Sequence, residues 1–185
     1  MHKFSPHNAA NLERDERYAL LKPAETLKRF GLATNMTFLD VGAGTGFFSR
    51  VASEIVGPKG KVFAADMSGE MLKFMKSKGI PANMKPLLSQ EYRVPLDDGI
   101  ADFTLVASVM HENAEPLKLV DELRRLTRKG GKILFVDWKK QEEGHGPPMQ
   151  ERLDVKDLQN MLKDFEKVET GELNGSYYFV LATNP

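Results

Sequence analysis

The sequence contains no cysteine, and this absence excludes several kinds of chemistry. A chain without cysteine forms no disulfide, binds no zinc through thiolates and has no thiol nucleophile. Long apolar runs are also missing, because no stretch approaches the roughly 18 residues of a membrane-spanning helix. The N-terminus shows no apolar core of a secretory signal. We therefore expect a cytoplasmic protein with no membrane insertion, and no residues indicate a metal site.

An excess of charge of either sign is missing as well. The 26 basic and 26 acidic residues give a formal net charge of zero. Proteins that bind nucleic acid or membrane surfaces normally carry a basic excess, so neither partner is expected. The 185 residues contain no repeat and no low-complexity tract, which predicts one domain over residues 1–185. These properties give no prediction of the oligomeric state.

What the sequence does contain is a regular alternation of apolar runs and helical periodicities. Residues 1–22 predict an N-terminal arm or helix, and Pro23 can open a helix that Gly31 ends. Further helices are expected at 46–56, after Ser68, at 116–128 and at 154–163. Strands are expected at 37–41, 61–65, 84–88, 102–107, 132–138, 167–173 and 177–183.

This order of elements predicts an α/β fold with a single-domain, Rossmann-like architecture. Alternating strands and helices favour a seven-stranded, mostly parallel sheet with helices on both faces. The last two strands flank Asn174-Gly175, a strong hairpin signal, so one strand should be antiparallel. Ligands bind such sheets at the carboxyl ends of the strands.

The most informative motif is the glycine turn over residues 42–46, between the first expected strand and its helix. A tight glycine turn lets a ligand come close to backbone N–H groups. Asp66 ends the second expected strand, where an acidic side chain can accept hydrogen bonds from ribose hydroxyls. The turn and Asp66 together indicate a cofactor that contains a nucleoside.

The glycine spacing helps to choose between cofactors. A dinucleotide site has the pattern Gly-x-Gly-x-x-Gly, whereas here Phe47 occupies the place of the last glycine. A phosphate-binding P-loop is excluded, because no Gly-Lys-Ser/Thr follows the glycines. A nucleotide-dependent oxidoreductase is therefore the weaker alternative.

Four segments, in the expected order, resemble the class I S-adenosylmethionine-dependent methyltransferases, particularly the small methyltransferase-11/UbiE-like group. The resemblance covers about residues 20 to 165. Its segments are Leu39–Gly46; Val62–Ser68 with Met71-Leu72; Val94-Pro95-Leu96 followed by Asp102-Phe103; and Glu122–Leu126 with Gly130–Leu134. It implies a methyltransferase fold and methyl transfer (EC 2.1.1.-) to an unidentified, small-molecule acceptor. The implied cofactor is S-adenosylmethionine, with S-adenosylhomocysteine as product.

The resemblance also implies a set of cofactor-binding residues: Asp40, Val41, Gly42, Ala43, Gly44, Asp66, Met67, Gln90, Glu91 and Ala107. The backbone of the glycine turn would pass close to the methionyl part. Asp66 would accept from both ribose hydroxyls and Met67 would pack on the adenine, while either Gln90 or Glu91 would reach the adenine amino group. Asp40 would fix the glycine loop by accepting from its backbone N–H groups.

The candidate catalytic residue is His111, which follows the fourth expected strand. Histidine titrates near neutrality and can act as a base for a hydroxyl or a carbon acid, and a capping or packing role is the alternative. The long loop over residues 139–153 is expected to form a substrate-side lid or wall. The N-terminal arm, with Phe4, His7 and Tyr18, would cover the cofactor. A non-catalytic module that binds the cofactor remains the alternative function.

Overall fold

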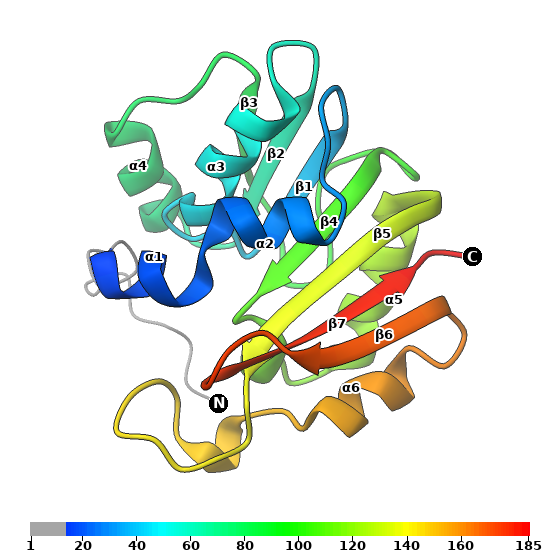
Figure 1. Ribbon diagram of the computed structural model, residues 1–185. Coiled ribbons are helices and arrows are strands. Elements are labelled where there is room, and N and C mark those ends of the chain that lie inside the picture. Colours follow the sequence, from blue (N-terminus) through cyan, green and yellow to red (C-terminus); the bar gives the residue numbers. More distant parts are fainter. Residues whose placement is uncertain (1–13) are drawn as a thin grey trace.

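The computed structural model describes residues 14–185 and is built around a seven-stranded sheet (Figure 1). The strand order is β3-β2-β1-β4-β5-β7-β6. The strands are β1 (Thr37–Val41), β2 (Lys61–Asp66), β3 (Met84–Leu88), β4 (Ala101–Ala107), β5 (Thr127–Trp138), β6 (Glu166–Glu172) and β7 (Tyr177–Thr183). β7 runs antiparallel to both of its neighbours, and the first five strands pair in parallel. The predicted fold class is confirmed.

Helices cover both faces of the sheet. They are α1 (Asp15–Leu21), α2 (Pro23–Arg29), α3 (Phe47–Val56), α4 (Gly69–Ser77), α5 (Pro116–Leu126) and α6 (Val155–Met161), with short 3-10 turns η2 (Met110–Glu112) and η3 (Met149–Glu151). The first four helices pack into one apolar cluster, and α5 and α6 pack into a second on the other face. Among the described residues, no helix is long and apolar enough to cross a membrane.

Local sequence signals account for several element boundaries. Ser68 caps α4 by accepting from the backbone N–H of Met71 at 3.3 Å, and Pro23 occupies the first turn of α2. The terminal hairpin is present, but its loop covers the four residues 173–176 instead of Asn174-Gly175 alone. Asn174 Oδ1 accepts from two N–H groups that follow it, which closes this longer loop.

The predicted ends of two helices are wrong, because α5 ends at Leu126 and not at residue 128, and α6 ends at Met161 and not at residue 163. We expected Gly130-Gly131 to break α5, yet both glycines lie within β5. Thr127 pairs with Ala101 and Lys132 pairs with Phe103, so the intervening residues form a bulge. A Cβ atom at Gly131 would lie 2.7 Å from the Thr127 side chain. The glycines therefore permit a bulged strand.

Candidate functional site

The carboxyl ends of β1 and β4 form the switch point of the sheet. These two strands are neighbours, and the chain continues from them toward opposite edges of the sheet. Ligands bind doubly wound sheets at such a point. The predicted residues of the glycine turn, Asp66, Ala107 and His111 all belong to strand ends or to the segments that follow them. Figure 1 shows α1 and the loop over residues 139–153 at this same edge.

The glycine loop follows β1 in a conformation that requires glycine. Gly42, Gly44 and Gly46 have φ angles of 75°, 55° and 85°. A Cβ atom at Gly42 would lie 2.3 Å from a methyl carbon of Val109. The backbone N–H groups of residues 42 and 43 donate to the carbonyl of Ala65 at 2.9 and 3.0 Å. The loop is thus folded back over the end of β2.

Asp66 lies beside this loop with its carboxylate already oriented. One oxygen accepts from the backbone N–H of Gly44 at 2.7 Å and the other from that of Ser68 at 2.7 Å. Burial raises the pKa of Asp66, and these two hydrogen bonds oppose the rise. A carboxylate oxygen has two lone pairs, so Asp66 retains acceptor capacity for a pair of hydroxyls.

Two exposed apolar side chains adjoin Asp66. Met67 is 48% exposed, and Leu88, the register partner of Asp66 on β3, is 61% exposed. Few large apolar side chains among the described residues are as exposed as these two. Both lie next to the buried carboxylate of Asp66. The sequence predicted Met67 but missed Leu88, whose place beside Asp66 follows only from the β2–β3 register.

Asp40 has a different partner from the one we expected. Its carboxylate accepts from the Ser49 hydroxyl, in the first turn of α3, at 2.6 Å. The N–H groups of the glycine loop donate elsewhere, to Ala65 and Asp66, because the loop folds toward β2. Asp40 therefore ties β1 to α3. Its side chain is buried, and this burial raises the pKa of Asp40 to about 7.

The segment after β3 also reaches this edge. The backbone N–H of Ser89 donates to the carbonyl of Asp66 at 3.0 Å, and Gln90 pairs with Arg93 in a short turn. Gln90 is exposed and Glu91 is half-buried, as is Ala107 at the end of β4. An adenine contact from Gln90 or Glu91, and the place of Ala107 beside the cofactor, stay predictions.

His111 forms a buried pair with Asp137, a residue that sequence reasoning missed. The His111 Nδ1 lies 2.7 Å from an Asp137 carboxylate oxygen, and both side chains are at most 5% exposed. Burial lowers the pKa of His111, but the hydrogen bond and charge of Asp137 outweigh it, so the pKa is raised above 6.5. Because a carboxylate accepts, Nδ1 carries the proton and Nε2 is the basic nitrogen of the neutral ring. The sequence offered one signal for Asp137, namely an acidic residue at the end of the apolar strand β5.

A second polar cluster lies on the other face of the same edge. Ser108, directly after β4, has a φ of 58°, a strained conformation for a non-glycine residue. The Tyr177 hydroxyl interacts with Ser108 and with Arg17 of α1. Tyr18 of α1 packs against Phe47 with ring centroids 4.3 Å apart and the rings tilted by 49°. The predicted covering by the N-terminal arm falls partly on Phe4 and His7, which lie outside the described residues.

The loop over residues 139–153 is held together by Arg152. This guanidinium donates to the backbone carbonyls of Lys139, Gln141, His145 and Pro147 and to Glu143, at 2.7–3.1 Å, with its side chain 1% exposed. It also lies 5.1 Å from the ring centre of Trp138. These contacts tie the two ends of the loop to its middle, and its role as a lid or wall beside the substrate stays a prediction.

We expect Arg152→Met to loosen this loop. The substitution keeps an apolar stem but leaves four carbonyls and one carboxylate without their donor, which should cost about 2–4 kcal/mol of unfolding free energy. Amide hydrogen exchange should speed up over residues 139–150. Lys140→Met, at an exposed position in the same loop, is the control. Unchanged exchange in the Arg152 variant would contradict the assignment.

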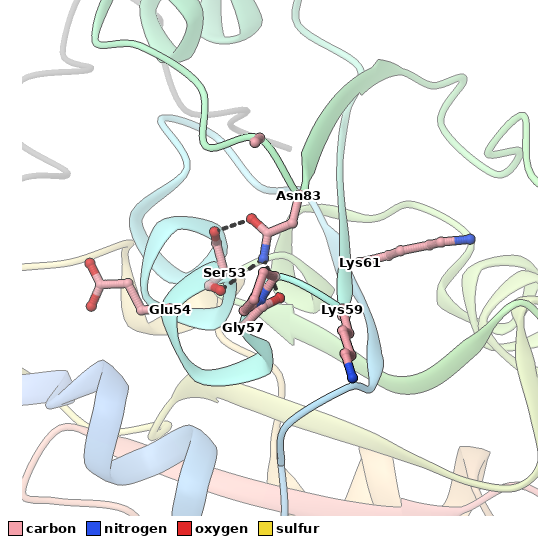
Figure 2. Close-up of a pocket in the computed structure, with 9 residues that line it drawn as sticks. Ser53, Glu54, Gly57, Lys59, Lys61 and Asn83 are labelled. Carbon is pink, nitrogen blue, oxygen red and sulfur yellow. Dashed lines mark hydrogen bonds between the residues drawn. The ribbon is translucent and has the colours of Figure 1, made fainter.

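Two open pockets, each of about 610 Å³, are lined by other residues than those described so far at the switch point. Figure 2 shows the first, at the amino end of β2, where Asn83 points toward Ser53 and Gly57. Its amide nitrogen donates to the carbonyls of both residues at 2.9 Å, so these groups satisfy one another. The second is lined by residues 142–150. Because ligands bind at the carboxyl ends of the strands, we assign the site to the switch point and not to the first pocket.

Comparisons with known proteins identify relatives of this chain. The family Methyltransf_11, a methyltransferase domain, matches residues 39–135. A demethylmenaquinone methyltransferase of Lactococcus lactis is 30% identical over 117 residues, which cover 62% of this chain and 46% of the relative. A ubiquinone/menaquinone biosynthesis C-methyltransferase, UbiE, of Pseudomonas fluorescens is 27% identical over 119 residues, with the same coverage. The matched regions thus span about half the length of these relatives.

A solved structure matches over nearly the whole length. The crystal structure of a SAM dependent methyltransferase from Aquifex aeolicus superposes with a TM-score of 0.91. It is 36% identical in sequence, and the match covers 99% of this chain and 100% of the other.

Proposed function

The chain belongs to the class I S-adenosylmethionine-dependent methyltransferases, in the family Methyltransf_11, and we propose that it transfers the methyl group of S-adenosylmethionine to a small-molecule acceptor. One observation supports this function best. The glycine loop, the oriented carboxylate of Asp66 and the His111–Asp137 pair converge at one edge of the sheet. A cofactor and a protonated acceptor could therefore meet between a binding group and a base.

The described residues fit such a cofactor. Asp66 would hold the ribose, because its oxygens are oriented by two backbone N–H groups and keep free lone pairs. Met67 and Leu88 would contact the adenine with their exposed apolar surfaces. The loop at Gly42 and Gly44 would lie along the methionyl part, where the absence of side chains permits close approach.

The chemistry divides between cofactor and protein. When bound, S-adenosylmethionine supplies a methyl group on a sulfonium, whose leaving group is already activated. The protein must align the acceptor and exclude water, and alignment can lower the barrier by up to about 7–11 kcal/mol. His111 would accept the acceptor's proton at Nε2 while Asp137 holds Nδ1–H and stabilises the resulting imidazolium.

The proposed role of His111 as a base limits the kinds of acceptor that we propose. A group that needs His111 is one that arrives protonated, such as a phenolic hydroxyl or an enolisable carbon. The two relatives are named for demethylmenaquinone and for ubiquinone/menaquinone biosynthesis, so a hydroxylated aromatic ring is the first acceptor class to test.

Calorimetry tests the cofactor. We expect the purified chain to bind S-adenosylhomocysteine and not NAD. Asp66→Asn should weaken S-adenosylhomocysteine binding by about 10- to 100-fold, because the ribose hydroxyls lose a charged acceptor. Asp97→Asn, at an exposed position away from the site, should change nothing. Binding of NAD without S-adenosylhomocysteine would refute the proposal.

A screen of methyl acceptors separates the enzyme from a non-catalytic module. Phenols, hydroxyquinones and other small molecules would be offered as acceptors of a radiolabelled methyl group. Formation of S-adenosylhomocysteine would be measured in the same reactions. Transfer to one of these classes supports the proposed activity. Tight cofactor binding with no transfer to any acceptor would favour a module that binds the cofactor without catalysis.

A further inference from the structure

A second carboxylate lies beside the nitrogen of His111 that would take up the acceptor's proton. Nδ1 is held by Asp137, and Nε2 lies 3.8 Å from a carboxylate oxygen of Glu112, the next residue along η2. This distance is longer than a hydrogen bond, so Glu112 acts on Nε2 through its charge. An acceptor hydroxyl bound to Nε2 at about 3 Å would therefore lie at most about 7 Å from that carboxylate oxygen.

A third carboxylate comes from the loop over residues 139–153. Glu151 is half-buried and ends η3, the short helical turn near the end of this loop. The next residue, Arg152, donates to the carbonyl of Lys139 at 3.0 Å, which brings the end of the loop back to the end of β5. Glu151 therefore lies near the strand end that carries Asp137.

The electrostatic effects on His111 agree with this placement. Burial lowers the pKa of His111, whereas the hydrogen bond and the charge of Asp137 raise it. The charges of Glu112 and Glu151 raise this pKa further, so the three largest charge effects on the ring all come from carboxylates. Arg152, a cation of the loop, is buried and donates to a loop carboxylate and to four backbone carbonyls. The acceptor end of the site therefore has a negative potential.

We propose that Glu112 and Glu151 select the acceptor by its charge, so that an uncharged hydroxylated ring is favoured over the same ring with a carboxylate. The inference rests on the proposed function, because it assumes that the acceptor binds at Nε2 of His111. A carboxylate on the ring would come close to two like charges in a largely buried site, where repulsion is only weakly screened. The same two charges stabilise the imidazolium that forms when His111 takes up a proton. One arrangement thus favours proton uptake and disfavours an anionic acceptor.

Two acceptors that differ by one charge test this selectivity. Catechol carboxamide and catechol carboxylate, substituted at the same ring position, have nearly the same shape, and only the second is an anion at neutral pH. Any other hydroxylated ring that reacts in the acceptor screen is offered as the same carboxamide–carboxylate pair. We expect the wild type to prefer the carboxamide by about tenfold or more in kcat/KM. Glu112→Gln and Glu151→Gln should each reduce this preference by about 3- to 10-fold, and the double variant should reduce it further.

A control and a second readout separate this role from a structural one. Glu142→Gln removes an exposed carboxylate from the same loop and should leave the preference unchanged. An NMR titration of His111 needs no acceptor. The pKa of His111 should be lower in Glu112→Gln and in Glu151→Gln than in the wild type, because each variant loses a charge that raises it.

The outcomes distinguish this inference from the proposed function. A wild type that transfers to the carboxylate as readily as to the carboxamide would overturn the selectivity while leaving the proposed function intact. Variants of Glu112 and Glu151 that keep the wild-type preference, or the wild-type pKa of His111, would do the same. Failure of the wild type to transfer a methyl group to any acceptor would instead refute the proposed activity, and this inference with it.

Discussion

Replacing His111 with Gln should lower the rate of methyl transfer to a protonated acceptor by about 10²- to 10⁴-fold, the usual contribution of a positioned base. Glutamine can still hydrogen-bond to Asp137 but cannot take up a proton at neutral pH. The binding of S-adenosylhomocysteine should stay within about twofold of the wild type. The measurement is single-turnover transfer to an acceptor from the screen, with calorimetry alongside. Unaltered turnover would remove His111 as the base.

Asp137→Asn tests whether the two residues act as a unit. The amide can present its N–H to Nδ1, which favours the tautomer with the proton on Nε2 and removes the basic lone pair. We expect a loss similar to that of His111→Gln, and the double variant should be no slower than the worse single variant. Asp121→Asn, at an exposed position on α5, is the control and should leave the rate unchanged.

The pH dependence of the rate follows from the sign of the His111 shift. Asp137 raises the pKa of His111 above 6.5, in spite of burial, and only the neutral ring can accept a proton. The rate should therefore fall as the pH drops through a pKa above 6.5. For the residual activity of Asp137→Asn, this fall should shift to lower pH, because the largest of the contributions that raise the His111 pKa is gone. A midpoint that does not move would contradict the pairing.

Local signals predicted the framework of the fold and half of the site. Strand periodicity and the caps depend on residues close together in sequence, so the sheet and the α4 cap at Ser68 were predictable. The same holds for the glycine turn and Asp66, since the turn directly follows β1 and Asp66 ends the next strand. Gly130-Gly131 was ambiguous, because paired glycines permit both a helix end and a strand bulge.

The remaining site residues depend on tertiary placement. Asp137 lies 26 residues from His111, and the two meet only because β4 and β5 are adjacent and in register. Helix α1 lies at the switch point because Asn174, near the other end of the chain, donates to its Leu20 carbonyl. The Asp40 carboxylate accepts from Ser49 and not from the amides of the glycine loop, because that loop folds toward β2. No spacing along the sequence encodes these encounters.

Asp40→Asn should stabilise the protein more at pH 8 than at pH 4. Burial raises the pKa of Asp40 from 3.8 to about 7, so the native state binds this proton more tightly than the unfolded state. The contribution of Asp40 to the free energy of unfolding should therefore fall as the pH rises from about 4 to 7, by up to about 4 kcal/mol at 1.36 kcal/mol per pKa unit. Asparagine can still accept from Ser49 and carries no charge to desolvate. Urea unfolding at both pH values measures the difference, and an equal effect of the substitution at the two pH values would contradict it.

Asp40→Asn should also weaken cofactor binding. A role in cofactor binding would explain why the chain has an ionisable residue at this buried position. The charge of Asp66 acts on Asp40, so Asp40 lies within reach of the ribose-binding group that we propose. A bound ammonium or sulfonium group would favour the ionised carboxyl, and binding near pH 7 should then release a proton. Calorimetry in two buffers of different ionisation enthalpy measures this release for the wild type. Asp40→Asn should abolish the release and lower the affinity by about tenfold. A variant that is more stable yet binds as tightly, with the proton release unchanged, would show that Asp40 acts only between β1 and α3.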